Sequence, residues 1–91
     1  MDLRWTSKAL SDLDRLYVFL APVNPQAAAR TVQNLVAAPR QLLLHPRRGE
    51  LLEEFYPRDV RRILIGAYEM RYEIRNSDIV ILRIWHTREN R

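Results

Sequence analysis

Arginine is the residue type in this sequence that is best suited to bind a charged partner. Of the fifteen Lys and Arg residues, all except Lys8 are arginine. A planar guanidinium group donates two hydrogen bonds at once to a phosphate or a carboxylate, so an arginine cluster can bind either anion. Eleven Asp and Glu residues leave a net charge of only +4 at pH 7. The placement of the arginines, rather than their number, must therefore decide what they bind.

Three arginines, Arg62, Arg71 and Arg83, are expected to form a row across neighbouring strands. Like charges directly opposite one another destabilise a sheet, which favours an anion or an acidic partner lying across such a row. Glu69 and Glu73 are expected on the same face, where they could instead neutralise the row as solvated ion pairs. We prefer the partner-binding interpretation, and the second interpretation stays open.

The end of the chain adds further candidates. Trp85 is expected beside Arg83 on the exposed face, where it could stack on a base, anchor a partner or cover the sheet edge. His86 is expected on the apolar face at the end of the sheet, where a single histidine is more often a packing residue than a catalyst. The predicted partner-binding residues are therefore Arg62, Arg71, Arg83, Trp85 and Arg88.

Several kinds of site are not expected from the sequence. The lack of cysteine excludes disulfides, thiol catalysis and thiolate metal sites. His45 and His86 are the only histidines, so no histidine-based metal site is expected. We find no Gly-rich phosphate loop, metal-binding carboxylate motif or nucleophile elbow, and expect neither a cofactor nor a small-molecule substrate. No apolar run reaches the roughly 20 residues of a membrane span, and the first residues do not resemble a signal peptide, so a cytoplasmic protein is expected.

Local signals predict which elements hold the candidate residues. Residues 3–5 are predicted to form a strand, and Thr6 or Ser7 to cap a helix whose apolar residues recur every three or four positions. Asn24-Pro25 is a second helix start, and Pro39 is predicted to kink that helix. The first half of the chain is therefore predicted to be a helical hairpin.

From residue 51 the apolar period changes to two, which is typical of strands. Residues 60–65, 68–75 and 79–85 are predicted to be strands, and 51–56 a weaker edge strand. We expect an α+β fold with an N-terminal strand and a helical hairpin packed on one face of a small antiparallel sheet. Residues 1–91 are expected to form a single domain.

The turn between the last two strands decides which side chains face each other, because a one-residue slip turns every side chain to the other face. A two-residue turn would put Arg71 opposite Leu82 and mix charge into the apolar face. A three-residue turn at 76–78 pairs Met70 with Ile84 and gives one clean apolar face, so we expect that turn. The last strand would then direct its alternate apolar residues to the core, namely Val80, Leu82 and Ile84.

Segments along nearly the whole chain share the order and spacing of a known toxin superfamily. They are Leu3-Arg4-Trp5-Thr6, Ala9-Leu10, Asp12-Leu13, Asn24-Pro25, Ala27-Ala28, His45-Pro46, Arg62-Ile63-Leu64-Ile65-Gly66 and Ile81-Leu82-Arg83-Ile84-Trp85-His86-Thr87-Arg88-Glu89. In these segments the chain resembles the RelE/ParE superfamily of toxins from bacterial type II toxin–antitoxin systems. The resemblance implies a growth-inhibiting toxin that a cognate antitoxin protein neutralises.

Two activities divide that superfamily, and the resemblance favours the ParE-like one. ParE-like members poison DNA gyrase without chemistry of their own, whereas RelE-like members cut messenger RNA in the ribosome. RelE-like nucleases typically carry an arginine where this chain has Glu69, and a tyrosine near the C-terminus, whereas no tyrosine follows Tyr72 here. The alternative is a ribosome-dependent endoribonuclease with Arg83, His86 and Arg88 as catalytic residues. A third hypothesis is a binding module that has lost its toxicity.

Overall fold

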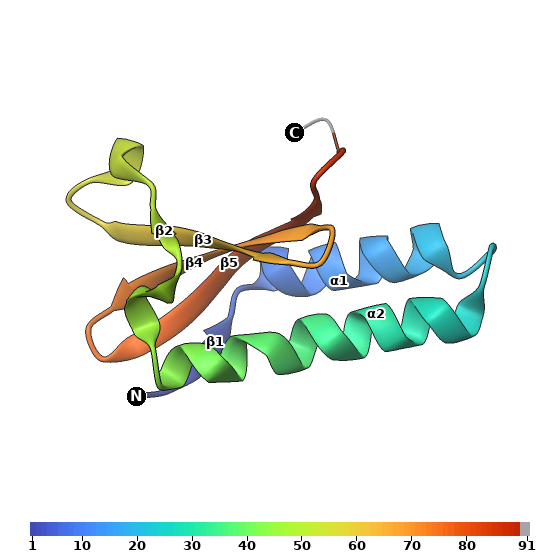
Figure 1. Cartoon of the computed structure of the whole chain (residues 1–91), viewed down its shortest axis with the longest axis horizontal. Helices are drawn as coiled ribbons and strands as arrows, with labels where there is room; N and C mark the ends of the chain where they lie inside the picture. The colour runs from blue at the N-terminus through green and yellow to red at the C-terminus, as the bar shows by residue number, and fades with distance from the viewer. Residues whose placement is uncertain (90–91) are drawn as a thin grey trace.

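Two helices cover one face of a five-stranded sheet (Figure 1). The computed structural model describes residues 1–89. The elements in chain order are β1 (Leu3–Trp5), α1 (Ser7–Leu20), α2 (Pro25–Ala37), η1 (Ala38–Leu43), η2 (Pro46–Arg48), β2 (Glu50–Leu51), η3 (Glu53–Phe55), β3 (Asp59–Ile65), β4 (Tyr68–Arg75) and β5 (Asp78–His86). The strand order is β1-β5-β4-β3-β2. The expected α+β fold is confirmed, with the addition that β1 runs parallel to β5 and makes the sheet mixed.

Both helices begin at the predicted cap residues. The Thr6 hydroxyl accepts a hydrogen bond of 3.1 Å from the Ala9 backbone N–H, and the Asn24 side chain accepts one of 3.0 Å from Ala27. Each cap satisfies a backbone donor that the first turn of a helix leaves without a partner. The chain continues beyond α2 as the 3₁₀ helix η1, which holds the buried Pro39. The predicted interruption at this proline is therefore confirmed.

The predicted edge strand over residues 51–56 is wrong in extent. Only Glu50–Leu51 pairs with β3, and the last ladder bond runs from the Leu52 N–H to the Val60 carbonyl at 2.8 Å. The chain then leaves the sheet edge as η3, which lies over the face opposite the helices (Figure 1). Phe55 in this turn packs 5.3 Å from the guanidinium carbon of Arg71. This contact across the face replaces further strand pairing.

A close approach between Gly49 and Tyr72 joins the β2 edge to the core. The Tyr72 hydroxyl donates to the Pro46 carbonyl at 2.7 Å and accepts from the Gly49 N–H at 2.8 Å. A Cβ atom at position 49 would lie 2.6 Å from that hydroxyl and 2.8 Å from the Arg62 carbonyl oxygen. No side chain fits there without displacing the backbone of β3.

We expect Gly49→Ala to lower the free energy of unfolding by about 2 kcal/mol, as overpacking of a well-packed site typically does. Urea unfolding followed by circular dichroism measures the loss. Gly66→Ala is the control: Gly66 has a φ of 59° but no atom within 4 Å of its added Cβ. Its backbone strain should cost about 1 kcal/mol. Equal stability of the Gly49→Ala and wild-type proteins would contradict the prediction.

The pairing of β3 with β4 follows the predicted register. Arg62 lies opposite Arg71, and Ile63 lies opposite Met70. A two-residue turn at 66–67 joins these strands, and Gly66 adopts the left-handed φ of 59° that such a turn needs.

The predicted three-residue turn between β4 and β5 is wrong. Arg75 pairs with Asp78 across a two-residue turn, and Asn76 takes the positive φ of 56°. Asparagine tolerates this conformation well, which makes the shorter turn possible. Tyr72 then lies opposite Ile81.

A β-bulge at Leu82 corrects the slip that the shorter turn would cause. The register shifts between Tyr72, opposite Ile81, and Arg71, opposite Arg83, so Leu82 is the extra residue. Beyond the bulge the predicted pairs return, and Met70 lies opposite Ile84 as expected. The prediction that Val80 and Leu82 share a face with Ile84 is therefore wrong. Ile79, Ile81 and Ile84 of β5 join the main core cluster, whereas Val80 is buried on the other face, opposite Glu73.

Candidate functional site

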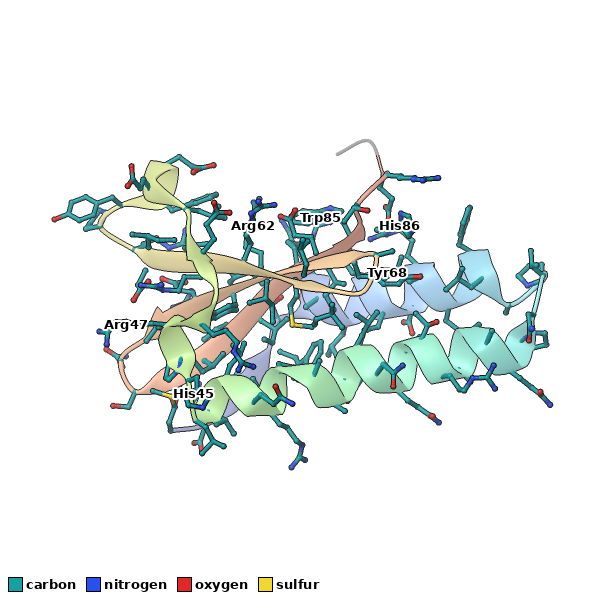
Figure 2. All side chains as sticks on the ribbon, in the orientation of Figure 1. His45, Arg47, Arg62, Tyr68, Trp85 and His86 are labelled. Carbon is teal, nitrogen blue, oxygen red and sulfur yellow. The ribbon has the colours of Figure 1, made fainter. Side chains whose placement is uncertain are left out.

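The structure places Arg62, Arg71 and Arg83 directly opposite one another on β3, β4 and β5. They lie on the sheet face turned away from α1 and α2, which we call the open face. Figure 2 shows Arg62 and Trp85 on this side of the sheet. The predicted adjacency of the three arginines is therefore confirmed.

A buried carboxylate divides the row. Only 2% of the Glu69 surface is exposed, and the residue lies between two of the arginines. Its Oε1 atom is 3.3 Å from Arg62, and its Oε2 atom is 3.6 Å from Arg71. Arg62 also bonds to Glu50 at 2.5 Å. Charge repulsion between Arg62 and Arg71 is thus relieved inside the protein.

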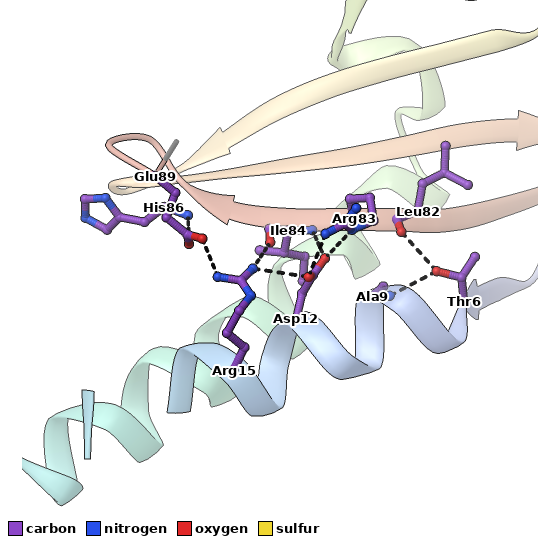
Figure 3. A network of polar contacts seen from close by, with 9 residues as sticks. All are labelled: Thr6, Ala9, Asp12, Arg15, Leu82, Arg83, Ile84, His86 and Glu89. Carbon is purple, nitrogen blue, oxygen red and sulfur yellow. Dashed lines mark hydrogen bonds and ion pairs between the residues drawn. The ribbon is translucent and has the colours of Figure 1, made fainter. Parts of the chain in front are cut away.

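The third arginine of the row is held by a carboxylate from α1. Arg83 donates two hydrogen bonds, of 2.8 and 3.1 Å, to the two oxygens of Asp12 (Figure 3). Asp12 also accepts a hydrogen bond of 2.8 Å from the Ile84 backbone N–H and one of 3.1 Å from Arg15. Burial alone would raise the pKa of Asp12, but these hydrogen bonds outweigh it and hold the pKa below its ordinary value. Asp12 therefore stays ionised at neutral pH and fixes Arg83 against the outer edge of β5.

Two aromatic rings, those of Phe55 and Trp85, pack against the guanidinium groups of Arg71 and Arg83 on the open face. Arg71 lies between Phe55 and Trp85, with its guanidinium carbon 5.3 and 4.8 Å from the two ring centroids. Arg83 lies 5.0 Å from the Trp85 ring. Trp85 is on the predicted face beside Arg83, but the expectation that it is exposed is wrong, since only 8% of it remains accessible. Guanidinium groups favour the face of an indole ring, so Arg71 and Arg83 cover it.

The remaining arginines of the open face are also paired. Arg58 and Arg75 bond to Glu73 at 2.9 and 2.6 Å, and Arg4 bonds to Asp78 at 3.2 Å. Hydrogen bonds from Arg58 are the largest effect on the pKa of the Glu73 carboxyl. They lower this pKa and outweigh the opposing effect of burial. The open face is thus a lattice of internal ion pairs rather than a field of unpaired cations.

The tail residues lie elsewhere. His86 is opposite Tyr68, and their rings meet edge to face with centroids 5.2 Å apart (Figure 2). Alternation beyond the bulge puts His86 on the helix side of the sheet and Arg83 on the open face. The Arg88 backbone N–H donates to His86 Nδ1 at 3.1 Å, and its exposed side chain forms no ion pair within residues 1–89. The structure therefore does not gather Arg83, His86 and Arg88 on one face.

The residue that the sequence analysis missed as a determinant of this surface is Asp12. A signal for it was present, since Asp12 occupies the third position after Ala9 on the apolar stripe that continues to Leu13 and Leu16. A charged residue on a buried stripe requires a partner. Phe55 was missed because the segment around it was predicted to stay in the sheet.

Within residues 1–89, no three His, Asp or Glu side chains gather in a way that could hold a metal ion. None of the helices in the described part of the chain is long and apolar enough to cross a membrane.

Known proteins match both the sequence and this architecture. The family described as "ParE toxin of type II toxin-antitoxin system, parDE" matches residues 3–91. Toxin RelE1 of Caulobacter vibrioides is 36% identical over 88 residues, which are 92% of this chain and 90% of the relative. Toxin RelE2 of the same organism is 30% identical over 82 residues, which are 90% of each chain.

Two solved structures share the fold. The chromosomal ParDE toxin–antitoxin system from P. aeruginosa superposes with a TM-score of 0.77 at 28% identity, over 94% of this chain and 95% of that chain. The RelBE2 toxin–antitoxin complex from Mycobacterium tuberculosis gives a TM-score of 0.63 at 25% identity, over 93% and 95%. A helical hairpin on this mixed sheet is thus the architecture of toxins from type II toxin–antitoxin systems. The chain belongs to the ParE toxin family of these systems.

Proposed function

We propose that this toxin inhibits growth by binding and poisoning DNA gyrase in the cytoplasm, and that a cognate antitoxin neutralises it. In this proposal the toxin acts by protein binding and carries out no reaction of its own. The observation that carries the proposal is the pairing of the open face: Glu69 lies buried between Arg62 and Arg71, and Asp12 holds Arg83. A surface whose arginines are already satisfied by carboxylates suits the mixed polar surface of a protein better than a phosphate backbone.

The family match supports the same direction. The matching family is described by its membership of parDE systems, and the P. aeruginosa ParDE structure gives a higher TM-score than the M. tuberculosis RelBE2 complex. Similarity of fold does not by itself assign a target, because one fold can carry several activities. The target therefore has to be argued from the surface of this chain.

The alternative function is a ribosome-dependent mRNA endoribonuclease. The names of the two Caulobacter relatives, Toxin RelE1 and Toxin RelE2, favour it. Such an enzyme would need Arg83, His86 and Arg88 around one scissile phosphate, with His86 as acid or base. Arg83 is held by Asp12 on the open face, whereas His86 packs against Tyr68 on the other side. This separation makes the nuclease the weaker candidate.

Two assays on the purified toxin distinguish the targets. We expect it to block the supercoiling of relaxed plasmid by DNA gyrase and to leave mRNA intact on translating ribosomes. Arg88→Ala should weaken the block about tenfold, because Arg88 is exposed and forms no ion pair within residues 1–89, so that its guanidinium is available to the target. Arg30→Ala on the exposed side of α2 is a matched control, because it removes the same charge elsewhere.

Codon-positioned cuts in mRNA with undisturbed supercoiling would refute the gyrase proposal and support the endoribonuclease. Unimpaired growth of cells that express the intact toxin would support the third hypothesis, a binding module without toxicity.

A further inference from the structure

A groove lies at the far end of the sheet from η3, between the end of α1 and the tail. Its apolar lining comes from Leu16, Phe19 and Leu20 of α1, with Tyr68 of β4 and His86 of β5 opposite. The cavity measures about 460 Å³, which is room for one or two large side chains. We call it the α1 groove.

Large apolar side chains are also exposed at the end of α1 and in the loop that follows it. Phe19 is 77% exposed, Val18 is 69% exposed, and Val23 in the loop after α1 is 90% exposed. Large apolar residues that gather at one place on a surface usually mark a protein contact. Exposed apolar side chains are thus available to a partner both in the groove, at Phe19, and at the hairpin tip, at Val18 and Val23.

A carboxylate of the toxin itself lies at the rim of the α1 groove. Glu89 forms an ion pair with Arg15 through one carboxylate oxygen, and its other oxygen accepts a hydrogen bond of 2.9 Å from the His86 backbone N–H (Figure 3). The turn that carries Glu89 also bonds to the protein through the Thr87 N–H, which donates to the Ala67 carbonyl at 2.8 Å, and through the Glu89 N–H, which donates to the His86 carbonyl at 2.9 Å. Both partners of the ion pair remain partly exposed, at 40% for Arg15 and 31% for Glu89. Such a pair contributes little stability and can be exchanged for another.

We propose that the α1 groove binds a segment of the antitoxin that presents a large apolar side chain next to an Asp or Glu, and that this carboxylate replaces Glu89 on Arg15. The apolar side chain fills the space between Phe19 and Tyr68. Glu89 is then an internal competitor that occupies the partner's position while the toxin is free. This inference rests on the proposed neutralisation by an antitoxin and does not depend on gyrase as the target.

The charge of the groove favours this occupant over others. Arg15 and Arg88 stand at the rim with Glu89 as the carboxylate among the lining residues. An acidic segment gains from both arginines, whereas a second copy of the chain brings a further net charge of +4. A nucleic acid backbone would have to place phosphates against Leu16 and Phe19, which offer it no hydrogen bonds.

Two variants test the proposal by opposite effects on affinity. The probe is the protein encoded by the reading frame that adjoins the toxin gene, and its dissociation constant is measured by isothermal titration calorimetry. We expect Phe19→Arg to weaken binding at least tenfold, because it puts a charge into the apolar contact. Glu89→Gln should tighten binding by about twofold to fivefold, because it removes the internal competitor.

Each variant has a matched control. Val36→Arg makes the same change on the exposed surface of α2, and Asp78→Asn removes the carboxylate of another partly exposed ion pair, that with Arg4. Neither should change the affinity, and circular dichroism melting checks that all four variants fold. The Glu89→Gln result separates competition from simple support, since a purely structural Glu89 would leave the affinity unchanged or lower it.

The proposal is overturned if Phe19→Arg binds like the wild type, or if Glu89→Gln fails to bind more tightly. It is also overturned if wild-type toxin alone dimerises in sedimentation and Phe19→Arg is monomeric, because the groove would then be a self-association site. If the wild type does not bind the adjoining protein at all, the antitoxin premise of the proposed function fails together with this inference. Binding by the wild type with no effect of Phe19→Arg refutes the groove alone.

Discussion

Asp12→Ala is expected to lower the free energy of unfolding by about 3 kcal/mol, the lower end for breaking a buried ion pair from one side, because the side chains of Arg83 and Arg15 are 36% and 40% exposed. Asp12 is 3% exposed and accepts hydrogen bonds from Arg83, Arg15 and the Ile84 backbone N–H. Its removal leaves the partly exposed guanidinium of Arg83 and the buried Ile84 N–H without their acceptor. Urea unfolding at pH 7, followed by circular dichroism, measures the change.

Asp14→Ala is the control for Asp12→Ala. Asp14 lies on the same helix and is exposed, so its loss should change the free energy of unfolding by less than about 0.5 kcal/mol. A similar small effect of both substitutions would show that Asp12 does not hold α1 to the outer edge of β5.

The free energy of unfolding should depend on pH differently in the wild type and in Asp12→Ala. Because the pKa of Asp12 is lower in the folded than in the unfolded protein, its stabilising effect is complete above the unfolded pKa of about 3.9. That effect is lost as the pH falls from there through the folded pKa. The stability gap between wild type and Asp12→Ala should therefore be constant from pH 7 to about pH 5 and narrow below pH 4. A gap that widens on acidification would contradict the assignment of a charged Asp12.

Local chemistry explains why so much of the fold could be predicted. Thr6 and Asn24 cap their helices through hydrogen bonds to residues three positions ahead. The alternation of apolar and polar residues predicts the strands at 68–75 and 79–85. These signals depend on neighbours in the sequence. The row of Arg62, Arg71 and Arg83 was also predicted, although one of the turns assumed for it was wrong.

Register and burial depend on atoms far away in the sequence, which is where the prediction failed. A two-residue turn with a bulge at Leu82 gives the same strand pairing beyond the bulge, such as Met70 with Ile84, as a three-residue turn without a bulge. The sequence pattern alone therefore does not distinguish the two turns. The burial of Trp85 likewise results from Arg71 and Phe55, and Phe55 reaches the open face only because the chain leaves the sheet after Leu52. For the candidate surface, the arginines were predictable, but the carboxylate partner on α1 was not assigned.

Glu69→Ala is expected to lower the free energy of unfolding by about 3 kcal/mol, the lower end for a buried ion pair, because its arginine partners stay partly solvated. Glu69 is 2% exposed, and its loss removes the carboxylate that lies near both Arg62 and Arg71, so that Arg62 keeps only Glu50 while it lies directly opposite Arg71. Thermal and urea unfolding measure the loss. Glu54→Ala is the matched control, since it removes one negative charge from the exposed turn η3.

The same pair of variants tests why the open face suits a protein better than a nucleic acid. If Glu69 masks the arginine row, Glu69→Ala should bind a single-stranded RNA oligonucleotide about tenfold more tightly at low salt, with a steeper salt dependence than the wild type. Glu54→Ala raises the net charge equally and should gain much less, because the ion pairs of Arg62 and Arg71 are with Glu50 and Glu69 and stay intact in this variant. Equal gains by both variants would mean that net charge alone governs RNA affinity. In that case the internal pairing of the row could no longer be used to argue against a ribosomal target.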